Sequence, residues 1–163
     1  MSYSKRDGVN SNSAVLVSVY PEDFEPYDAN ELFNGKNGLN YVDHDNPHHT
    51  FSVGHHCLAA YGLVRNGSDE LQEAALFHDI GKPYTKAFID SKGNPCEVAH
   101  FYQHQCVGAW ITYCLYGESM PINVAWLVST HMDPYLNTKY YNKLPAYLKK
   151  QVDLLHEADR NAH

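Results

Sequence analysis

The sequence has little positive charge and no long apolar run. Its 163 residues include 12 Lys and Arg against 19 Asp and Glu, and the net charge of -7 argues against an extended binding surface for duplex nucleic acid. No stretch approaches the roughly 18 consecutive apolar residues of a membrane-spanning helix, and the N-terminus lacks the apolar core of a signal peptide. The sequence therefore predicts a cytoplasmic protein without a membrane or duplex partner.

A cysteine framework is missing too. The four cysteines include no C-x-x-C pair, so neither a zinc knuckle nor a set of disulfides is indicated. Hydrophobic residues make up 44% of the chain and charged residues 19%, against about 25% in an average protein, which excludes the composition of a disordered chain. The length suits one folded domain, with or without a short extension.

Histidine, in contrast, is abundant. Eleven histidines stand beside only 12 lysines and arginines. Because imidazole titrates near neutral pH and binds metal ions, the positions of these histidines decide which chemistry the chain can support.

The residue pattern divides the chain into two parts. Residues 1–46 are rich in Ser, Asn, Asp, Gly and Pro and hold one β-like apolar run at 14–20, so we expect an irregular N-terminal extension with one strand or helical turn. Over residues 47–163 apolar residues recur at helical spacing, which predicts an all-α, compact bundle of at least five helices. The expected helices are 52–65, 69–80, 98–116, 121–132 and 145–161. The polar segment 84–94 is expected to cross the surface just after Gly81 stops the second helix.

In each predicted helix an ionisable group continues the apolar stripe. Residues at i, i+3, i+4 and i+7 share a helix face, so His78 lies on the same face as Leu71 and Ala75. The groups placed in this way are His56, His78, His104, His131 and Asp159. Taken singly, each histidine is explained by burial with one hydrogen bond.

The carboxylates argue more strongly for a metal. A buried carboxylate without a partner costs several kcal/mol or takes up a proton, so Asp79 and Asp159 need compensation. Lys82 and Arg160 are near in sequence but are expected to rotate toward other sides. A shared divalent ion would compensate all these groups, and Mn, Fe, Co, Ni or Zn suits such ligands better than Ca, with Mg still open. Because His78 and Asp79 diverge by about 100° around the axis, the ion is expected beside the helix end.

Other histidines and the tyrosines offer weaker alternatives. His100 and His104 stand at i and i+4 and could chelate an ion alone, but the pattern lacks an accompanying Glu. Loop or entrance positions are expected for His48, His49 and His55, and surface or structural positions for His44, His156 and His163. Packing of a tyrosine-rich surface is favoured over base stacking for the aromatic cluster Tyr135, Tyr140, Tyr141 and Tyr147.

Three stretches of the sequence match a known pattern. Residues 74–83 read AALFHDIGKP, residues 100–109 read HFYQHQCVGA, and residues 127–131 read LVSTH. With His56 before them and Asp159 after them, the order H...HD...D resembles that of the HD-domain metal-dependent phosphohydrolases, whose motifs include AALLHDIGKP and HFYGHEVVGA. The resemblance spans about residues 47–161 and is especially to the HD modules of bacterial CCA-adding tRNA nucleotidyltransferases.

This resemblance implies a set of metal ligands. The ligands of one ion would be His56, His78, Asp79 and Asp159. In two-metal members the positions of His104 and His131 serve a second ion, with Asp79 as the bridge, although these two histidines could instead contact phosphate. One or two divalent ions per chain are therefore expected. Gln103 and Gln105 depart from the Gly and Glu of the pattern, and the tRNA substrate is not implied.

The expected activity is hydrolysis of a phosphate ester. By resemblance, metal-activated water attacks phosphorus in a nucleotide or a similar small phosphorylated substrate, with Asp79 orienting the water or accepting its proton. Lys82 is the first candidate for a phosphate clamp and Lys86 the second, although Lys82 could equally complement the dipole at a helix C-terminus. Phosphomonoesterase, phosphodiesterase and nucleoside triphosphohydrolase activities all stay open.

Two further functions are weighed against this one. The chain could be a catalytically idle HD module that binds a nucleotide or an RNA end, but the complete ligand set argues against it. The extension could also dock a partner or a second copy of the chain, giving a homo-oligomer, through the apolar side chains of Phe24, Tyr27 and Phe33.

Overall fold

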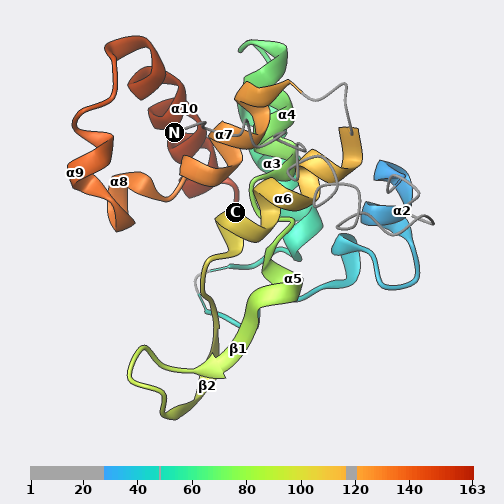
Figure 1. The fold of residues 1–163 in the computed structure, drawn as a ribbon. Coiled ribbons are helices and arrows are strands. Elements are labelled where there is room, and N and C mark those ends of the chain that lie inside the picture. The colour runs from blue at the N-terminus through green and yellow to red at the C-terminus, as the bar shows by residue number, and fades with distance from the viewer. Residues whose placement is uncertain (1–27, 48, 117–120) are drawn as a thin grey trace, which may run out of the picture.

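The computed structural model describes residues 28–47, 49–116 and 121–163 (Figure 1). Helices dominate these residues, and the sheet found among them has two strands, which confirms the expected all-α fold. The β-like run at 14–20 lies outside the described residues. In chain order the elements are α2 (Ala29–Asn34), η1 (Leu39–Tyr41), α3 (Val53–Leu63), α4 (Asp69–Phe77), α5 (Lys82–Thr85), β1 (Lys86–Ile89), β2 (Pro95–Phe101), α6 (His104–Tyr116), α7 (Ile122–Thr130), α8 (Asp133–Leu136), α9 (Thr138–Tyr141) and α10 (Ala146–Asn161).

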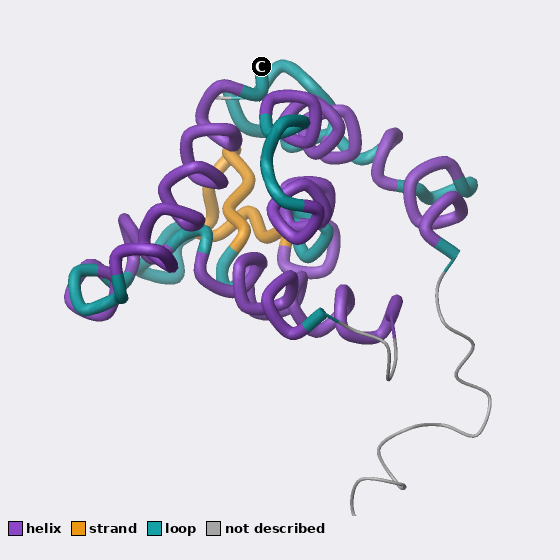
Figure 2. The backbone as a smooth tube through the Cα atoms, turned by 90° about the horizontal axis from the view of Figure 1, so that it is seen from above, coloured by secondary structure: helices purple, strands orange, loops and turns teal. Residues whose placement is uncertain are grey.

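The core lies between helices that are far apart in the sequence. Helix α4 packs against α3 and α7, α10 contacts all three of these helices, and α6 packs along α7. Figure 2 shows how the helices, in purple, make up most of the described chain. Ala60 and Ala74 are fully buried at these contacts, which lets the helices approach closely. Burial of Leu71 and of Leu155 contributes about 1.5–3 kcal/mol each to folding. This core fixes the positions at which α3, α4, α7 and α10 begin and end.

Serine caps begin two of these helices. The Ser52 side chain accepts a hydrogen bond from the backbone N–H of His55 at the start of α3, and Ser68 accepts one from the N–H of Leu71 at the start of α4. The expected helix starts at residues 52 and 69 therefore agree with the structure. At its other end α4 stops at Phe77, and His78 is its C-cap.

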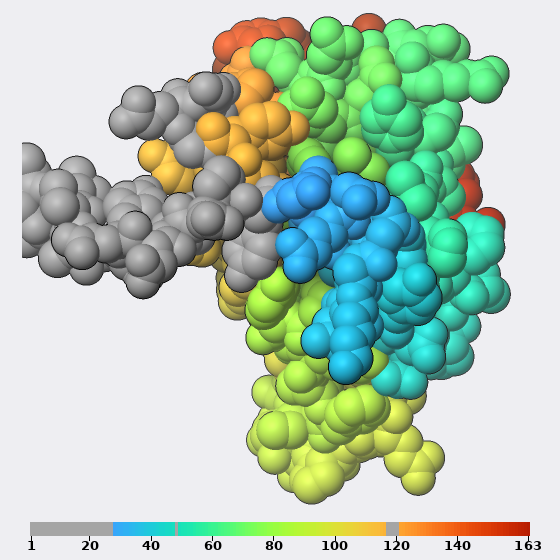
Figure 3. Space-filling model, turned by 90° about the vertical axis from the view of Figure 1, so that its right-hand side faces the viewer, coloured from blue at the N-terminus to red at the C-terminus, as the bar shows by residue number. Residues whose placement is uncertain are grey.

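The third expected helix starts later than predicted, at His104. Residues Pro95–Phe101 instead form β2, which pairs antiparallel with β1 and sets Lys86 opposite Phe101. The helix prediction for 98–103 was wrong because Gln103 has a φ of 62°, a left-handed conformation that interrupts the chain before α6. The resulting hairpin projects from the body of the molecule (Figure 3).

Part of the N-terminal extension belongs to the core. Helices α2 and η1 bring Leu32, Phe33 and Leu39 into the buried cluster, and Figure 3 shows this segment, in blue, lying against the rest of the molecule. The expectation that Phe33 offers an apolar anchor to a partner is wrong, because only 6% of this residue is exposed. Phe24 and Tyr27 lie outside the described residues. The domain division after residue 46 stays a prediction.

Helix length separates the expected helices from the unexpected ones. Helices α8 and α9 have four residues each, too few to show a helical period in the sequence, and they were not predicted. The 16-residue α10 was predicted almost to its bounds. Within the described ranges, every helix is too short or too polar to cross a membrane.

Gly81 lies so close to the backbone of α6 that a larger residue at this position should destabilise the fold. A Cβ at this position would overlap the carbonyl oxygen of His104 and lie 2.6 Å from the backbone nitrogen of Gly108. Its own φ of -78° is open to any residue, so contact with α6, not a left-handed helix stop, explains the glycine. Gly81→Ala should therefore lower the free energy of unfolding by about 1–3 kcal/mol in urea denaturation.

Gly62 provides the matched control. It lies within α3, and a Cβ there would meet no atom within 4 Å. Gly62→Ala should raise the free energy of unfolding by about 0.5–1 kcal/mol, because alanine loses less conformational entropy in a helix. Equal stability of the Gly81→Ala variant and the parent chain would refute the close-approach explanation.

Candidate metal centre

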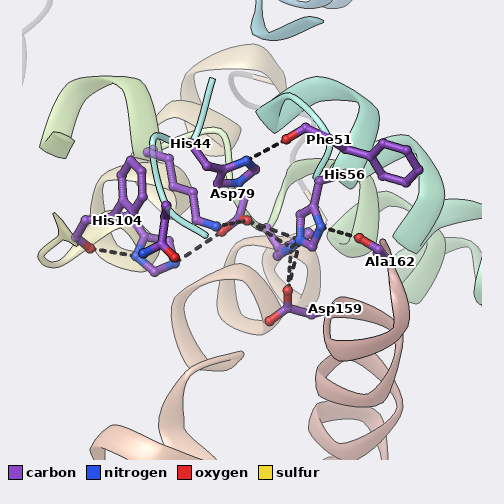
Figure 4. Close-up of polar contacts among 12 residues, drawn as sticks. His44, Phe51, His56, Asp79, His104, Asp159 and Ala162 are labelled. Carbon is purple, nitrogen blue, oxygen red and sulfur yellow. Dashed lines mark hydrogen bonds and ion pairs between the residues drawn. The ribbon is translucent and has the colours of Figure 1, made fainter. Parts of the chain in front are cut away.

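Six imidazole and carboxylate side chains converge where several helices end or begin. They are His56 from α3, His78 and Asp79 from the end of α4, His104 from the start of α6, His131 from the end of α7, and Asp159 from α10. Figure 4 shows His56, His104 and Asp159 gathered around Asp79. One group that could hold an ion comprises His56, His78, Asp79 and Asp159, and a second comprises Asp79, His104 and His131. Within each group the potential ligand atoms lie within 4.8 Å of one another.

Each of the four histidines is oriented by a backbone carbonyl. The Nδ1 atom of His56 lies 2.8 Å from the carbonyl oxygen of Ala162. The other three Nδ1 atoms each meet the carbonyl three residues earlier in the chain, in the pairs His78–Ala75 at 2.8 Å, His104–Phe101 at 2.8 Å and His131–Val128 at 2.7 Å. A carbonyl oxygen only accepts, so each Nδ1 carries the hydrogen, and in the neutral ring Nε2 is left with a lone pair. Such a second contact is typical of metal-binding histidines.

The Nε2 atoms face one another in two pairs. His56 Nε2 lies 3.2 Å from His78 Nε2, and His104 Nε2 lies 3.2 Å from His131 Nε2. Two lone pairs at this distance repel each other unless a proton or a metal cation lies between them. Buried nitrogen and carboxylate donors in this arrangement fit a divalent transition metal.

Asp79 stands between the two groups and turns one oxygen toward each. Its Oδ2 atom lies 3.4 Å from the Nε2 atoms of both His56 and His78. Its Oδ1 atom lies 3.2 Å from His104 Nε2 and 3.9 Å from His131 Nε2. A carboxylate in this position can bridge two cations.

Asp159 completes the first group from the opposite side. Its Oδ1 atom lies 2.9 Å from His56 Nε2 and 3.4 Å from His78 Nε2. Only 18% of the Asp159 side chain is exposed, whereas the Asp79 side chain is almost fully buried. The first group is therefore open to solvent mainly beside Asp159.

The position of Lys82 differs from the expected one, in which its side chain pointed away from the buried carboxylates. Its Nζ atom lies 2.6 Å from Asp79 Oδ2, and the residue is 5% exposed, so Lys82 turns toward the site and not away from it. The chain bends at Gly81 and begins α5, which brings Lys82 back over Asp79. The supposed lack of a nearby cation therefore no longer argues for a metal, and the convergence of nitrogen and carboxylate donors in two groups carries that argument instead.

Lys86, the second candidate clamp, points elsewhere. Its Nζ atom lies 2.5 Å from the Asp45 carboxylate and 2.6 Å from the carbonyl oxygen of Asp43. Its charge is thus compensated on the loop that precedes α3.

The ionisation of the centre follows from burial and from these neighbours. Burial alone would raise the pKa of Asp79, but the charges of Lys82 and His78 hold that pKa well below its usual value. Burial alone would lower the pKa of His78, but Asp79 and the neighbouring acidic groups raise it well above 6.5. Burial and the adjacent His78 and His104 lower the pKa of His131 to about 3. A proton on His78 therefore balances part of the carboxylate charge at neutral pH.

A cavity of about 260 Å³ opens over the centre. Asp79, Lys82 and Asp159 line it, together with His49 and His100. The predicted entrance position of His49 agrees with this lining. His100 lies in the wall, where its ring stacks on Tyr102, and it belongs to neither donor group, so its proposed chelation with His104 is not supported.

The remaining histidines occupy different surroundings. His55 is exposed and contacts the side chain of Ser52, and His163 is exposed at the C-terminus. His156 is half-buried against the ring of Tyr135. His48 lies outside the described residues.

Of the two positions expected for His44, surface or structural, the structure shows the structural one, beside the centre. It is 2% exposed, stacks on His49 with 3.9 Å between ring centroids, and meets the edge of His56. Its Nδ1 lies 2.9 Å from the carbonyl oxygen of Phe51, and burial lowers its pKa to about 4, so the ring stays neutral. No periodic pattern marks its irregular segment, and this supporting role had no signal in the sequence.

Comparison with known proteins places the chain in a family. The model of the HD domain matches residues 48–160, which include all six converging side chains. Neither a curated protein nor a solved structure gives a match.

The proton on His78 predicts a pH dependence of metal binding. A cation that binds Nε2 must displace this proton, because the pKa of His78 is raised and the ring is protonated at neutral pH. Affinity for Mn²⁺ should therefore rise with pH, by about tenfold per unit for each displaced proton, between pH 6 and the raised pKa. Calorimetric titration in buffers of different ionisation enthalpy measures both the affinity and the released protons.

His156→Ala is the control for that titration, since this histidine lies outside both donor groups. The variant should show the same pH dependence as the parent chain. Equal Mn²⁺ affinity at pH 6 and pH 8, without proton release, would contradict the assignment.

Proposed function

From the premise that the chain belongs to the HD-domain family, we infer that it is a metal-dependent phosphohydrolase. We propose as its substrate a nucleotide or a similar small phosphate ester. The observation that supports this most is the pairing of inward Nε2 atoms on either side of one shared carboxylate, Asp79. Four histidines used only for packing would not need to turn their Nε2 atoms toward one another and toward a carboxylate.

We assign the ligands by the two groups that the fold brings together. The first ion would be held by His56, His78, Asp79 and Asp159, and the second by Asp79, His104 and His131. Two ions are favoured over one because each oxygen of Asp79 faces a separate histidine pair. Mn, Fe, Co, Ni, Zn and Mg are the candidates. A bound divalent ion supplies hydroxide near neutral pH and offsets charge on phosphoryl oxygens.

Asp79 and Lys82 have separate roles in this proposal. Asp79 stays ionised over the working pH range because its pKa is well below the usual value, so its oxygens can accept hydrogen bonds from the attacking water and orient it. Lys82 lines the cavity with its ammonium beside Asp79, where it can bind a phosphate oxygen of the substrate. Lys86 is excluded as the clamp by its pairing with Asp45.

The side chains in the cavity wall would position the substrate and limit its shape. His49 is held by its stack on His44 and by the edge of His56. Burial and the nearby charge of Lys82 lower the pKa of His49 to about 3, so it meets the substrate as a neutral ring. Phe101 adds an aromatic wall and lies 5.3 Å from Lys82 Nζ, measured to the ring centroid.

The alternative is an HD module that binds a nucleotide or an RNA end without turnover. It would use the same cavity. We propose, in that case, that the chain resembles most the HD modules of CCA-adding enzymes. The paired donors favour catalysis, because binding a nucleotide end does not require two such groups around one carboxylate.

Hydrolysis by the metal-loaded protein is the test of the proposed activity. Protein incubated with Mn, Co or Ni should cleave model phosphoesters and members of a nucleotide panel. His78→Ala should reduce the rate by at least about 100-fold, because it removes a ligand from the first group, while circular dichroism shows unchanged helicity. The product distinguishes the reaction: orthophosphate from a monoester, a monoester from a diester, and tripolyphosphate from a nucleoside triphosphate.

Lys86→Ala is the matched control, since its ammonium is paired away from the cavity, and it should keep its activity. Nucleotide binding without turnover under every metal would favour the idle module instead. Full activity of folded His78→Ala would refute the proposed centre.

A further inference from the structure

We propose that α9, the loop after it and the first turns of α10 form a binding surface for single-stranded nucleic acid. Residues 134–152 contain four lysines, Lys139, Lys143, Lys149 and Lys150, and none of the 19 acidic residues of the chain. This concentration stands out because the chain as a whole carries a net charge of -7. A local basic segment on an acidic protein provides charge complementarity to a phosphate backbone.

Three of the four lysines have free ammonium groups. Lys139, Lys143 and Lys150 are exposed, and within the described part of the chain no hydrogen bond or ion pair engages their Nζ atoms. Lys149 is held differently, with Nζ 4.4 Å from the ring centroid of Tyr141. The surface therefore offers three cations to phosphates without first breaking an ion pair.

Tyrosines lie among these lysines with their rings open to solvent. Tyr135 is 60% exposed, Tyr140 43% and Tyr147 69%. Tyr141, in contrast, is half-buried and its hydroxyl donates to Asp153, so packing within the chain accounts for this ring. Exposed aromatic rings between cations are the usual means of binding unpaired bases, which stack on the rings while lysines contact phosphates.

A second cavity of about 310 Å³ lies beside this surface. Trp126 and Tyr147 give it two aromatic walls, and the side-chain amide of Gln151 also lines it. The Asn123 amide and the Glu70 carboxylate complete the polar lining, with Asn123 donating a hydrogen bond to Glu70. Lys150 follows Tyr147 by three residues, so the two lie on the same side of α10. A flat ring with amide groups nearby suits a base edge, and a lysine one turn away suits the attached phosphate.

The surface and the metal centre share α10 but are well separated. Tyr147 precedes Asp159 by 12 residues, or about 18 Å of helix. Tyr135 bridges part of that distance, because its ring lies 4.7 Å from that of His156. A strand bound to this surface could place its end at the metal centre, and this consequence rests on the proposed function. Binding of the strand to the surface does not depend on that function.

A single strand fits this surface better than a duplex or a membrane. Base pairing hides the faces that would stack on Tyr135, Tyr140 and Tyr147. A duplex also presents a denser phosphate charge to a chain whose net charge is -7. The cavity, with its aromatic walls and polar side chains, can enclose a base, whereas a lipid headgroup has no aromatic ring to place there.

Fluorescence anisotropy with labelled 12-nucleotide oligo(dT) and oligo(U) tests the proposal. The full chain is titrated in EDTA, so that hydrolysis plays no part and failure of the proposed activity leaves this result interpretable. Binding should be saturable, and three free lysines predict a slope of about -2 for log K against log salt. Lys143→Gln combined with Lys150→Gln should reduce that slope to about -0.7 and weaken binding.

Two further variants separate stacking and specific charge from general attraction. Tyr147→Ala should weaken binding by about tenfold without changing the salt slope. Lys36→Gln combined with Lys92→Gln removes the same charge from exposed positions outside the surface and should leave binding unchanged. Melting curves establish that each variant is folded.

Several results would overturn the proposal. They are a lack of binding at low salt, equal weakening by the two lysine pairs, and equally tight binding of a duplex of the same length. If the protein sediments with phosphatidylserine vesicles but binds no oligonucleotide, the surface binds lipid instead, and the proposal is equally refuted.

Discussion

The fixed direction of four imidazole Nε2 atoms is the constraint on which the rest of the structure depends. Each Nδ1–H is held by a carbonyl, and for His78, His104 and His131 that carbonyl lies three residues earlier in the chain. The last carbonyls of a helix have no partner within it, so a histidine at the C-cap can use one of them. The bundle therefore has to bring the ends of α4 and α7 and the start of α6 to one place.

Asp79 turns that convergence into one centre instead of two. Its oxygens face separate histidine pairs, and Lys82 keeps the carboxylate ionised although it is buried. The tight contact of Gly81 with α6 sets the bend that returns Lys82 to Asp79. The four consecutive residues 79–82 therefore provide the shared carboxylate, the close contact with α6 and the buried cation of the centre.

The sequence could predict the longer helices and the burial of the ionisable groups on them, because apolar residues recur at the helical period in those segments. Their grouping as one ligand set followed from the resemblance to the HD-domain family. It could not predict the direction of Lys82, which depends on a bend and on the following α5. The hairpin was missed because its strands are short and largely exposed, so they lack a clear two-residue burial pattern. For His44 the sequence left a surface and a structural position open, because the residue lies outside any periodic element, and the structure shows it buried beside the centre.

An anomalous-difference map from crystals of the protein grown with Mn²⁺ tests the two-ion centre most directly. Two peaks are expected, one between His56, His78 and Asp159 and one beside His104 and His131, with Asp79 between the peaks. A map without a peak at either place, in crystals in which the Nε2 atoms still face one another, would contradict it.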